Sequence, residues 1–147
     1  MTRAPTDTDI TDVSRLPDGY WRLPEGNRVW IKDGKYHRTD GPALVCASNE
    51  TLIYYQHGKY HRDDGPALVC ASNEVLIYYQ HGKHHRDDGP AYIDRRGQEW
   101  WLNNKCYTFS EWVEANDKMT GEQKVMLKLM YGDGTEPARG ADLMFAN

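Results

Sequence analysis

A histidine, an arginine and an aspartate recur together in this sequence in the order His-Arg-x-Asp, and all three side chains can do chemistry. The copies are His37/Arg38/Asp40, His61/Arg62/Asp64 and His85/Arg86/Asp88. Because an arginine fork binds phosphate oxygens in pairs, one interpretation makes Arg38, Arg62 and Arg86 phosphate-binding residues. The other has each arginine pair with a nearby aspartate and each histidine cap a turn carbonyl. This structural interpretation carries more weight, because a motif present in every copy serves the fold of that copy.

The histidines predict neither a metal centre nor a catalytic centre. Five of them gather in one part of the sequence, at His57, His61, His81, His84 and His85. Zinc needs about four converging ligands, whereas equivalent histidines of neighbouring copies should lie about 10 Å apart and point the same way. Catalysis needs one asymmetric set of groups with different roles, and this sequence offers three near-copies. We therefore expect no metal, no cofactor and no enzymatic activity.

Aromatic residues form the third candidate site. Successive side chains of a strand point to opposite faces, so one ring of each adjacent tyrosine pair belongs to the core and the other is exposed. Exposed tyrosines anchor protein interfaces, or stack on bases when cations flank them. The predicted partner-binding residues combine these rings with the neighbouring cations: Tyr54, Tyr55, Tyr78, Tyr79, His57, Lys59, His81, Lys83 and His84.

A tandem repeat must position all of these residues. The string from Asp33 to Ala43 returns at 57–67 and again at 81–91, at intervals of 24 residues. Within each copy, β-branched and aromatic residues at 52–55 or 76–79 are typical of strands, and a second extended run follows the Gly-Pro pair. We therefore predict one antiparallel hairpin per copy, because a repeat of this kind buries its apolar face only by stacking.

Turn residues support the hairpins. The pairs Asp33-Gly34, His57-Gly58 and His81-Gly82 occupy one equivalent position. Aspartate, histidine and above all glycine tolerate the positive φ of a two-residue hairpin turn. The predicted fold is mainly β, a single twisted antiparallel meander sheet of about eight strands.

The C-terminal segment predicts two helices that cap the sheet. Capping boxes begin at Thr108 and Thr120, and the expected apolar face of the second helix is Val125, Met126, Leu129 and Met130. We expect the helices to cover the sheet near Trp100 and Trp101. The predicted organisation is a flexible N-terminus (1–16), a repeat domain (17–107), a helical cap (108–132) and a loose tail (133–147) in which Leu143, Met144 and Phe145 are the residues able to dock.

Composition narrows the function classes. The 147 residues carry a net charge of -4, which argues against a protein that coats nucleic acid but leaves room for a local basic stripe. No apolar run is long enough to span a membrane, and the first residues lack a signal-peptide pattern. Three cysteines then indicate free thiols in a reducing, cytoplasmic setting. Cys46 and Cys70, one repeat apart, are too distant for a disulfide and are expected to be small apolar fillers.

The tract Gly-Lys-x-His-Arg-x-Asp-Gly-Pro-Ala, preceded by a strand rich in tryptophan and tyrosine, resembles the MORN-like repeat proteins of bacteriophages and large viruses. The resemblance covers about residues 18–107, and Tyr107–Trp112 is similar to the helical ends of such proteins. It implies an interaction scaffold for proteins or phospholipid surfaces, and a phage-encoded cytoplasmic protein that acts on a host component. One departure is that the usual Asn-Gly turn appears here as Asp33-Gly34, His57-Gly58 and His81-Gly82.

The expected function is a non-enzymatic interaction module that binds and inhibits a host defence or regulatory protein. An alternative is a binder or sponge for nucleotides or nucleic acid that uses the Arg/His row and the exposed rings. A hydrolase or nuclease is a third interpretation, and it would require one histidine copy to matter far more than the others. Self-association through an open sheet edge also remains open.

Overall fold

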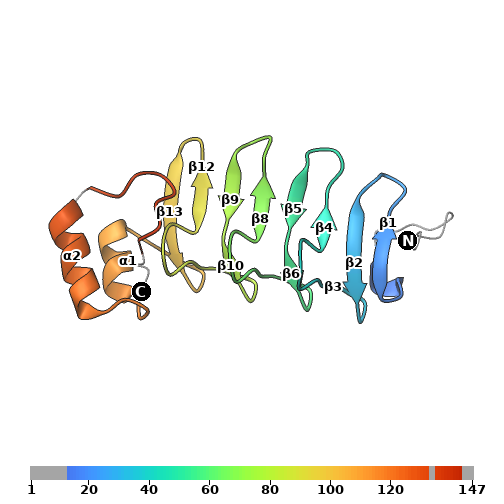
Figure 1. The fold of residues 1–147 in the computed structure, drawn as a ribbon, viewed down its shortest axis with the longest axis horizontal. Coiled ribbons are helices and arrows are strands. Elements are labelled where there is room, and N and C mark those ends of the chain that lie inside the picture. The colour runs from blue at the N-terminus through green and yellow to red at the C-terminus, as the bar shows by residue number, and fades with distance from the viewer. Residues whose placement is uncertain (1–12, 133–134, 144–147) are drawn as a thin grey trace.

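The computed structural model describes residues 13–132 and 135–143, and it shows a row of β-hairpins ending in two helices (Figure 1). A short 3₁₀ helix, η1 (Val13–Arg15), precedes the first strand. The strands are β1 (Gly19–Arg22), β2 (Arg28–Lys32), β3 (Lys35–Tyr36), β4 (Leu44–Val45), β5 (Thr51–Ile53), β6 (Tyr55–Gln56), β7 (Lys59–Tyr60), β8 (Leu68–Cys70), β9 (Val75–Ile77), β10 (Tyr79–Gln80), β11 (Lys83–His84), β12 (Tyr92–Asp94), β13 (Gly97–Leu102) and β14 (Lys105–Tyr107). The helices are α1 (Phe109–Ala115) and α2 (Gly121–Tyr131).

The predicted meander is confirmed. Ten strands form the main antiparallel sheet in the order β1-β2-β4-β5-β8-β9-β12-β13-β14, with β3 paired to β2. The pairs β6-β7 and β10-β11 form two small sheets of their own, and Tyr54 and Tyr78 separate them from the strands β5 and β9 of the main sheet. The sheet therefore has more strands than the eight expected, and each middle copy contributes two strands to it.

Backbone turns with positive φ close the hairpins at one end of every copy. The pairs Asp33-Gly34, His57-Gly58 and His81-Gly82 all have positive φ, between 49° and 82°. Asn103 and Asn104, at 48° and 69°, make the same turn before β14. This confirms the predicted two-residue hairpin turns. We call these four turns, together with β3, β7, β11 and the first residue of β14, the rim.

The apolar core is concentrated at the two ends of the row. In the middle copies, fully buried alanines follow the Gly-Pro bends, at Ala43, Ala67 and Ala91. The N-terminal cluster consists of Leu16, Trp21, Leu23, Val29 and Ile31. The C-terminal cluster consists of Trp100, Leu102, Phe109, Trp112, Val113, Met119, Leu127 and Leu143. Since one hairpin layer buries little by itself, these two clusters act as end caps for the stack.

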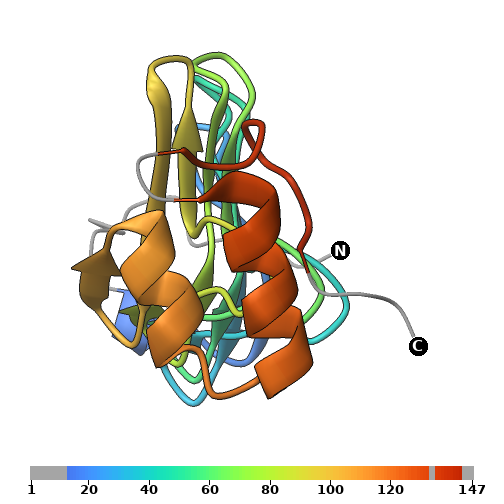
Figure 2. The same cartoon turned by 90° about the vertical axis from the view of Figure 1, so that its left-hand side faces the viewer.

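The helical cap begins at the two predicted capping boxes. Thr108 accepts the amide of Glu111, and Thr120 accepts the amide of Gln123, with the reciprocal side-chain bond present in both. Trp112 of α1 lies 4.7 Å from the ring of Trp100. Viewed from that end, α1 and α2 stand side by side across the stack (Figure 2), so the expected cover over Trp100 is present.

The predicted apolar face of α2 is wrong. Val125, Met126, Leu129 and Met130 are all exposed, and the exposed fraction of Leu129 reaches 82%. Leu127 is instead the residue that α2 buries in the C-terminal cluster. A helical pattern identifies apolar stripes, but the docking angle of the helix decides which stripe meets the protein. Trp101 is likewise not covered by the helices, because it lies beside the rim.

Two segments expected to be loose are packed. Leu16 is buried in the N-terminal cluster, so the flexible N-terminus does not extend through residue 16. The tail at 135–143 folds back over the last copy, where Leu143 is buried and its amide donates to the carbonyl of Asp88 at 2.6 Å. Glu136 accepts from the indole of Trp100 at 2.7 Å. Met144, Phe145 and residues 1–12 lie outside the described residues.

All three cysteines are free thiols, as expected. Cys70 alone is buried, while Cys46 is half-buried and Cys106 exposed. Cys70 is a buried core residue, as expected of a small filler, and its Sγ also lies 3.4 Å from the hydroxyl of Ser72. Hydrogen bonds from Ser72 and then Thr51 lower the pKa of this thiol from 9.0 to about 7. Among the described residues, no helix is both long and apolar enough to cross a membrane.

Candidate functional site

The arginines of the repeated motif are bound within their own copies. The Nε of Arg38, Arg62 and Arg86 donates to the aspartate two positions later at 2.8, 2.9 and 2.8 Å. Each Nη1 donates to the carbonyl of a proline four positions later, at 3.2 Å in all three copies. This supports the structural interpretation of the motif, since two of the three guanidinium nitrogens are committed to the bend.

Each of these arginines also covers an aromatic ring. The Cζ atoms lie 4.0 to 4.1 Å above the rings of Trp30, Tyr54 and Tyr78. On the other side of the guanidinium, a Cβ on Gly41 would lie 2.7 Å from Cζ of Arg38, which explains the glycine of the motif. Tyr54 and Tyr78, which we predicted to bind a partner, are therefore stacked against arginine rather than presented as free rings.

The motif histidines hold neighbouring copies together. Nδ1 of His37, His61 and His85 accepts the turn amide of the following copy, at 3.0, 2.9 and 3.1 Å. The expected bond to a turn carbonyl is therefore wrong, because each imidazole caps an amide one copy away. In His61 and His85 the second ring nitrogen pairs with Asp63 or Asp87 at 2.9 Å. With both nitrogens engaged, neither ring has a free site for general base catalysis.

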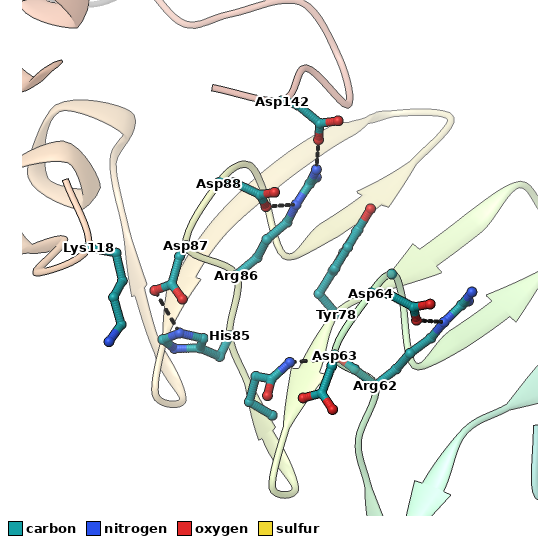
Figure 3. Close-up of a pocket in the computed structure, with 12 residues that line it drawn as sticks. Arg62, Asp63, Asp64, Tyr78, His85, Arg86, Asp87, Asp88, Lys118 and Asp142 are labelled. Carbon is teal, nitrogen blue, oxygen red and sulfur yellow. Dashed lines mark hydrogen bonds and ion pairs between the residues drawn. The ribbon is translucent and has the colours of Figure 1, made fainter. Parts of the chain in front are cut away.

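Two equivalent clefts lie between successive motif loops, with volumes of about 440 and 370 Å³. Figure 3 shows the larger one, where Arg86 lies between Asp88 and Asp142 and Arg62 is paired with Asp64. Five aspartates line this cleft against two arginines and one lysine. In the smaller cleft, three aspartates face two arginines. The excess of carboxylates opposes phosphate binding by Arg38, Arg62 and Arg86.

Six aromatic rings follow the rim, three of them within it, and we call them the ring ladder. The first five are stacked in succession, and the sixth, Trp101, is tilted against His84. Their centroids are separated in turn by 4.9, 4.9, 4.7, 4.5 and 4.8 Å, along the series Tyr36, Tyr55, Tyr60, Tyr79, His84 and Trp101. Burial raises the pKa of Tyr36 and Tyr79, and that of Tyr55. Tyr36 and Tyr60 were not among the predicted site residues, although the recurring Gly-Lys-Tyr string was a signal for them.

The four inner rings of the ladder, Tyr55, Tyr60, Tyr79 and His84, each have a neighbouring ring on both sides, so their faces are already occupied. A base would have to separate two rings at about 4.9 Å to stack between them, which would break the existing contacts. The ring ladder is therefore a poor platform for stacking nucleotides. Its ring edges and hydroxyls remain suited to contact with protein side chains.

A row of lysines lies next to the ring ladder. Lys35, Lys59, Lys83 and Lys105 occupy the first positions of β3, β7, β11 and β14, and all four are exposed. In the described part of the chain, no carboxylate pairs with the ammonium groups of the first three, and Lys105 lies 5.1 Å from the ring centroid of Tyr107. We call these four residues the lysine row.

The stems of this row are held against the turns. The side chain of Lys35 lies over Gly58, where a Cβ would approach its Cδ to 3.3 Å, and that of Lys59 lies over Gly82. The amides of both glycines donate to the carbonyls of Tyr36 and Tyr60 in the preceding copy, at 2.9 and 2.8 Å. The ammonium groups thus project from a rim whose copies are bonded together.

The predicted partner-binding residues separate onto two surfaces. Seven of them gather at the rim or in the ring ladder beside it: His57, Lys59, His81, Lys83, His84, Tyr55 and Tyr79. There the imidazole of His57 lies tilted against that of His37, with ring centroids 4.6 Å apart, and that of His81 against His61, with centroids 4.3 Å apart. Tyr54 and Tyr78 lie instead with the arginines in the clefts. The rim therefore holds most of the predicted site.

Acidification from about pH 8 to about pH 5 should lower the melting temperature. Burial, and then the neighbouring His57, holds the pKa of His37 below its ordinary 6.5, and burial does the same for His84. Below pH 6.5 the unfolded chain therefore binds more protons than the folded one, so this stabilisation is present above pH 6.5 and lost as the pH falls through it. Protonation also removes the Nδ1 acceptor that holds the amide of His57.

Thermal unfolding followed by circular dichroism at a series of pH values measures this effect. The control is the double variant H37N/H84Y, since asparagine keeps an acceptor and tyrosine is the residue of the equivalent positions Tyr36 and Tyr60. It should show a flatter dependence between pH 5 and 8. A melting temperature that stays constant or rises on acidification of the unmodified protein would contradict the assignment.

No group of three or more His, Cys, Asp or Glu side chains within the described residues is arranged to hold a metal ion. In comparisons with known proteins, no family model, no curated protein and no solved structure matches this chain.

Proposed function

We propose that this protein is a non-enzymatic interaction module that binds another protein through its rim. The observation that carries the proposal is the continuous strip of exposed lysines and histidines beside the ring ladder. Tyrosine and tryptophan are enriched at protein interfaces, where a few residues supply most of the binding energy, and cations beside them favour a partner of complementary charge. Because the strip repeats from copy to copy, it offers a long contact surface rather than a pocket.

The clefts support a binding role over a catalytic one. Their arginines are engaged by aspartates and prolyl carbonyls, and their histidines by turn amides and aspartates. Each copy also presents the same groups in the same arrangement, without the division of roles that catalysis requires. These groups hold the repeats in register, which is what a rigid recognition surface needs.

The resemblance to MORN-like phage proteins extends the proposal to the partner. On that reading the protein is phage-encoded, acts in the host cytoplasm, and inhibits a host defence or regulatory protein by occupying its surface. The MORN-like identity and the inhibition are both parts of this proposal.

Binding of nucleotides or nucleic acid is the second candidate function, and the lysine row is the observation that favours it. The occupied ring faces and the carboxylate excess of the clefts weigh against it. Salt separates the two functions, because counterion release makes phosphate-driven binding fall steeply as salt rises. An interface dominated by ring edges should weaken much less.

Charge reversal at the rim tests the proposal. The unmodified protein, immobilised, should retain a specific host protein identifiable by mass spectrometry, and K59E or K83E should reduce the affinity of the purified partner by about tenfold or more. The matched control is R96E, the same charge change at an exposed residue in the turn between β12 and β13. Equal affinity of K59E, K83E and R96E for the partner would exclude the rim as the binding surface.

A further inference from the structure

We propose that the segment recognised by the rim is an acidic α-helix lying along it, with carboxylates seven residues apart that each meet one member of the lysine row. This inference rests on the proposed function, since it names the class of partner for the same surface. It follows from three observations: the unpaired charge of the lysine row, its spacing, and the ring ladder parallel to it.

The protein has two rows of cations, the motif arginines and the lysine row, and they differ in whether a carboxylate neutralises them. Each motif arginine is paired with an aspartate two positions later, whereas Lys35, Lys59 and Lys83 have no carboxylate partner in the described part of the chain. Asp33 is the only acidic residue of the four rim turns. In a chain of net charge -4, the lysine row is a local positive stripe that complements an anionic partner.

The spacing of the lysine row follows from the strand spacing of the repeat. Each copy adds two strands to the main sheet, and neighbouring strands lie about 4.8 Å apart, so consecutive lysines are separated by about 10 Å. The ring ladder gives the same interval independently, because two steps of 4.9 Å lead from Tyr36 through Tyr55 to the equivalent Tyr60. The ring contacts repeat at 4.5 to 4.9 Å along the ladder, and the stems of Lys35 and Lys59 pack on the next turn, so the interval is regular.

Possible partners differ in how closely their repeating groups match the interval of about 10 Å between consecutive lysines. An α-helix rises about 1.5 Å per residue, so residues seven apart lie about 10.5 Å apart on the same face. A β-strand presents one face every second residue, at about 6.7 Å. Duplex DNA carries one phosphate per about 3.4 Å of each strand and winds its phosphates away from a straight row. The α-helix therefore fits the lysine row best.

The ring ladder adds a second stripe that an amphipathic helix can match. Residues three positions after each carboxylate lie one turn further along the same face, turned about 60° to one side of the carboxylate row. With that side toward the ring ladder, apolar side chains there would meet the ring edges of Tyr55, Tyr60 and Tyr79. A polyproline II chain also brings every third side chain to the same face, about 9.3 Å apart. Its threefold symmetry turns the two intervening side chains away from that face, so none of them lies between two carboxylates to meet the rings. The full row of four lysines spans about 30 Å, the length of about 20 helical residues.

Synthetic peptides test the inference without knowledge of the natural partner. The probe is a fluorescent helical peptide of four heptads with one glutamate per heptad and leucine three and four positions later. One control has the same composition as the probe but carries its glutamates at every fifth residue, and a second differs from the probe by a proline in the middle of each heptad. Anisotropy should show the heptad peptide binding at least about tenfold more tightly than both controls, and more tightly than a single-stranded oligonucleotide of equal charge at the same ionic strength.

Charge exchange makes the assignment specific. The double variant K59E/K83E should no longer bind the heptad peptide and should instead bind a peptide with lysine in place of glutamate. R96E should bind the heptad peptide as tightly as the unmodified protein does. Equal binding of the heptad and fifth-residue peptides, equal binding of the proline peptide, or tighter binding of the oligonucleotide would overturn the acidic helix. If the peptides fail while K59E and K83E still release a captured host protein, the acidic helix is wrong and the proposed function stands. If K59E and K83E change neither peptide binding nor capture of the host protein, the acidic helix and the proposed function are both wrong.

Discussion

Replacement of Trp112 by alanine is expected to lower the free energy of unfolding by about 3–5 kcal/mol, the range for removing a fully buried large aromatic. Trp112 is 0% exposed, lies against Trp100 and Phe109, and donates its indole hydrogen to the carbonyl of Arg86 at 3.1 Å. The variant leaves a cavity in the C-terminal cluster and an unsatisfied carbonyl at the last motif loop. The helical cap should then detach before the repeats unfold.

Urea unfolding followed by tryptophan fluorescence and by far-ultraviolet circular dichroism measures both effects. The matched control is W101A, because Trp101 is half-exposed at the end of the ring ladder, 4.8 Å from His84. Its loss should cost about 1 kcal/mol. Equal costs for the two variants would mean that α1 does not support the repeats in the way described.

Replacement of Arg86 by alanine should lower the free energy of unfolding by about 3 kcal/mol, and the same change at Arg62 by about 1 kcal/mol. The two arginines have equivalent partners within their own copies, but the Arg86 side chain is 5% exposed and that of Arg62 is 25% exposed. Arg86 also pairs with Asp142 of the tail. Removal of Arg86 therefore leaves Asp88, Asp142 and the carbonyl of Pro90 without their donor, at a more buried site than that of Arg62, and releases the tail.

Thermal and urea unfolding of R86A and R62A compare the same substitution in two copies of one sequence motif. D142N is the additional control, since it removes only the ion pair to the tail and should fall between the two. A cost for R62A as large as that for R86A would show that the contact with the tail contributes nothing to stability.

Local features of this chain could be read from its sequence because each depends on neighbouring residues. The positive φ at His57 and His81 follows from a turn that ends in glycine. The helix starts at Thr108 and Thr120 follow from capping boxes only four residues long. The repeat interval then implied that equivalent side chains form rows, and the ring ladder is such a row.

Features that depend on distant residues could not be predicted in this way. The partner of each motif histidine is an amide in the following copy, and Asp142, 56 positions after Arg86, completes the last arginine site. The exposed stripe of α2 is the clearest failure. The apolar residues of α2 were correctly identified. Because Leu127 packs against the C-terminal cluster, however, Leu129 faces the solvent.

By itself, the sequence determined the hairpin, the turn type, the helix starts and the existence of parallel rows, because these arise from backbone preferences and a constant repeat length. The tertiary structure alone decided which contacts join one copy to the next. Each arginine reaches the aspartate of its own copy, as the sequence suggested, and a prolyl carbonyl there as well, but the amide that His61 holds belongs to the following copy, and Asp142 reaches Arg86 from the tail. These contacts join residues far apart in the sequence, so they form only once the copies have stacked.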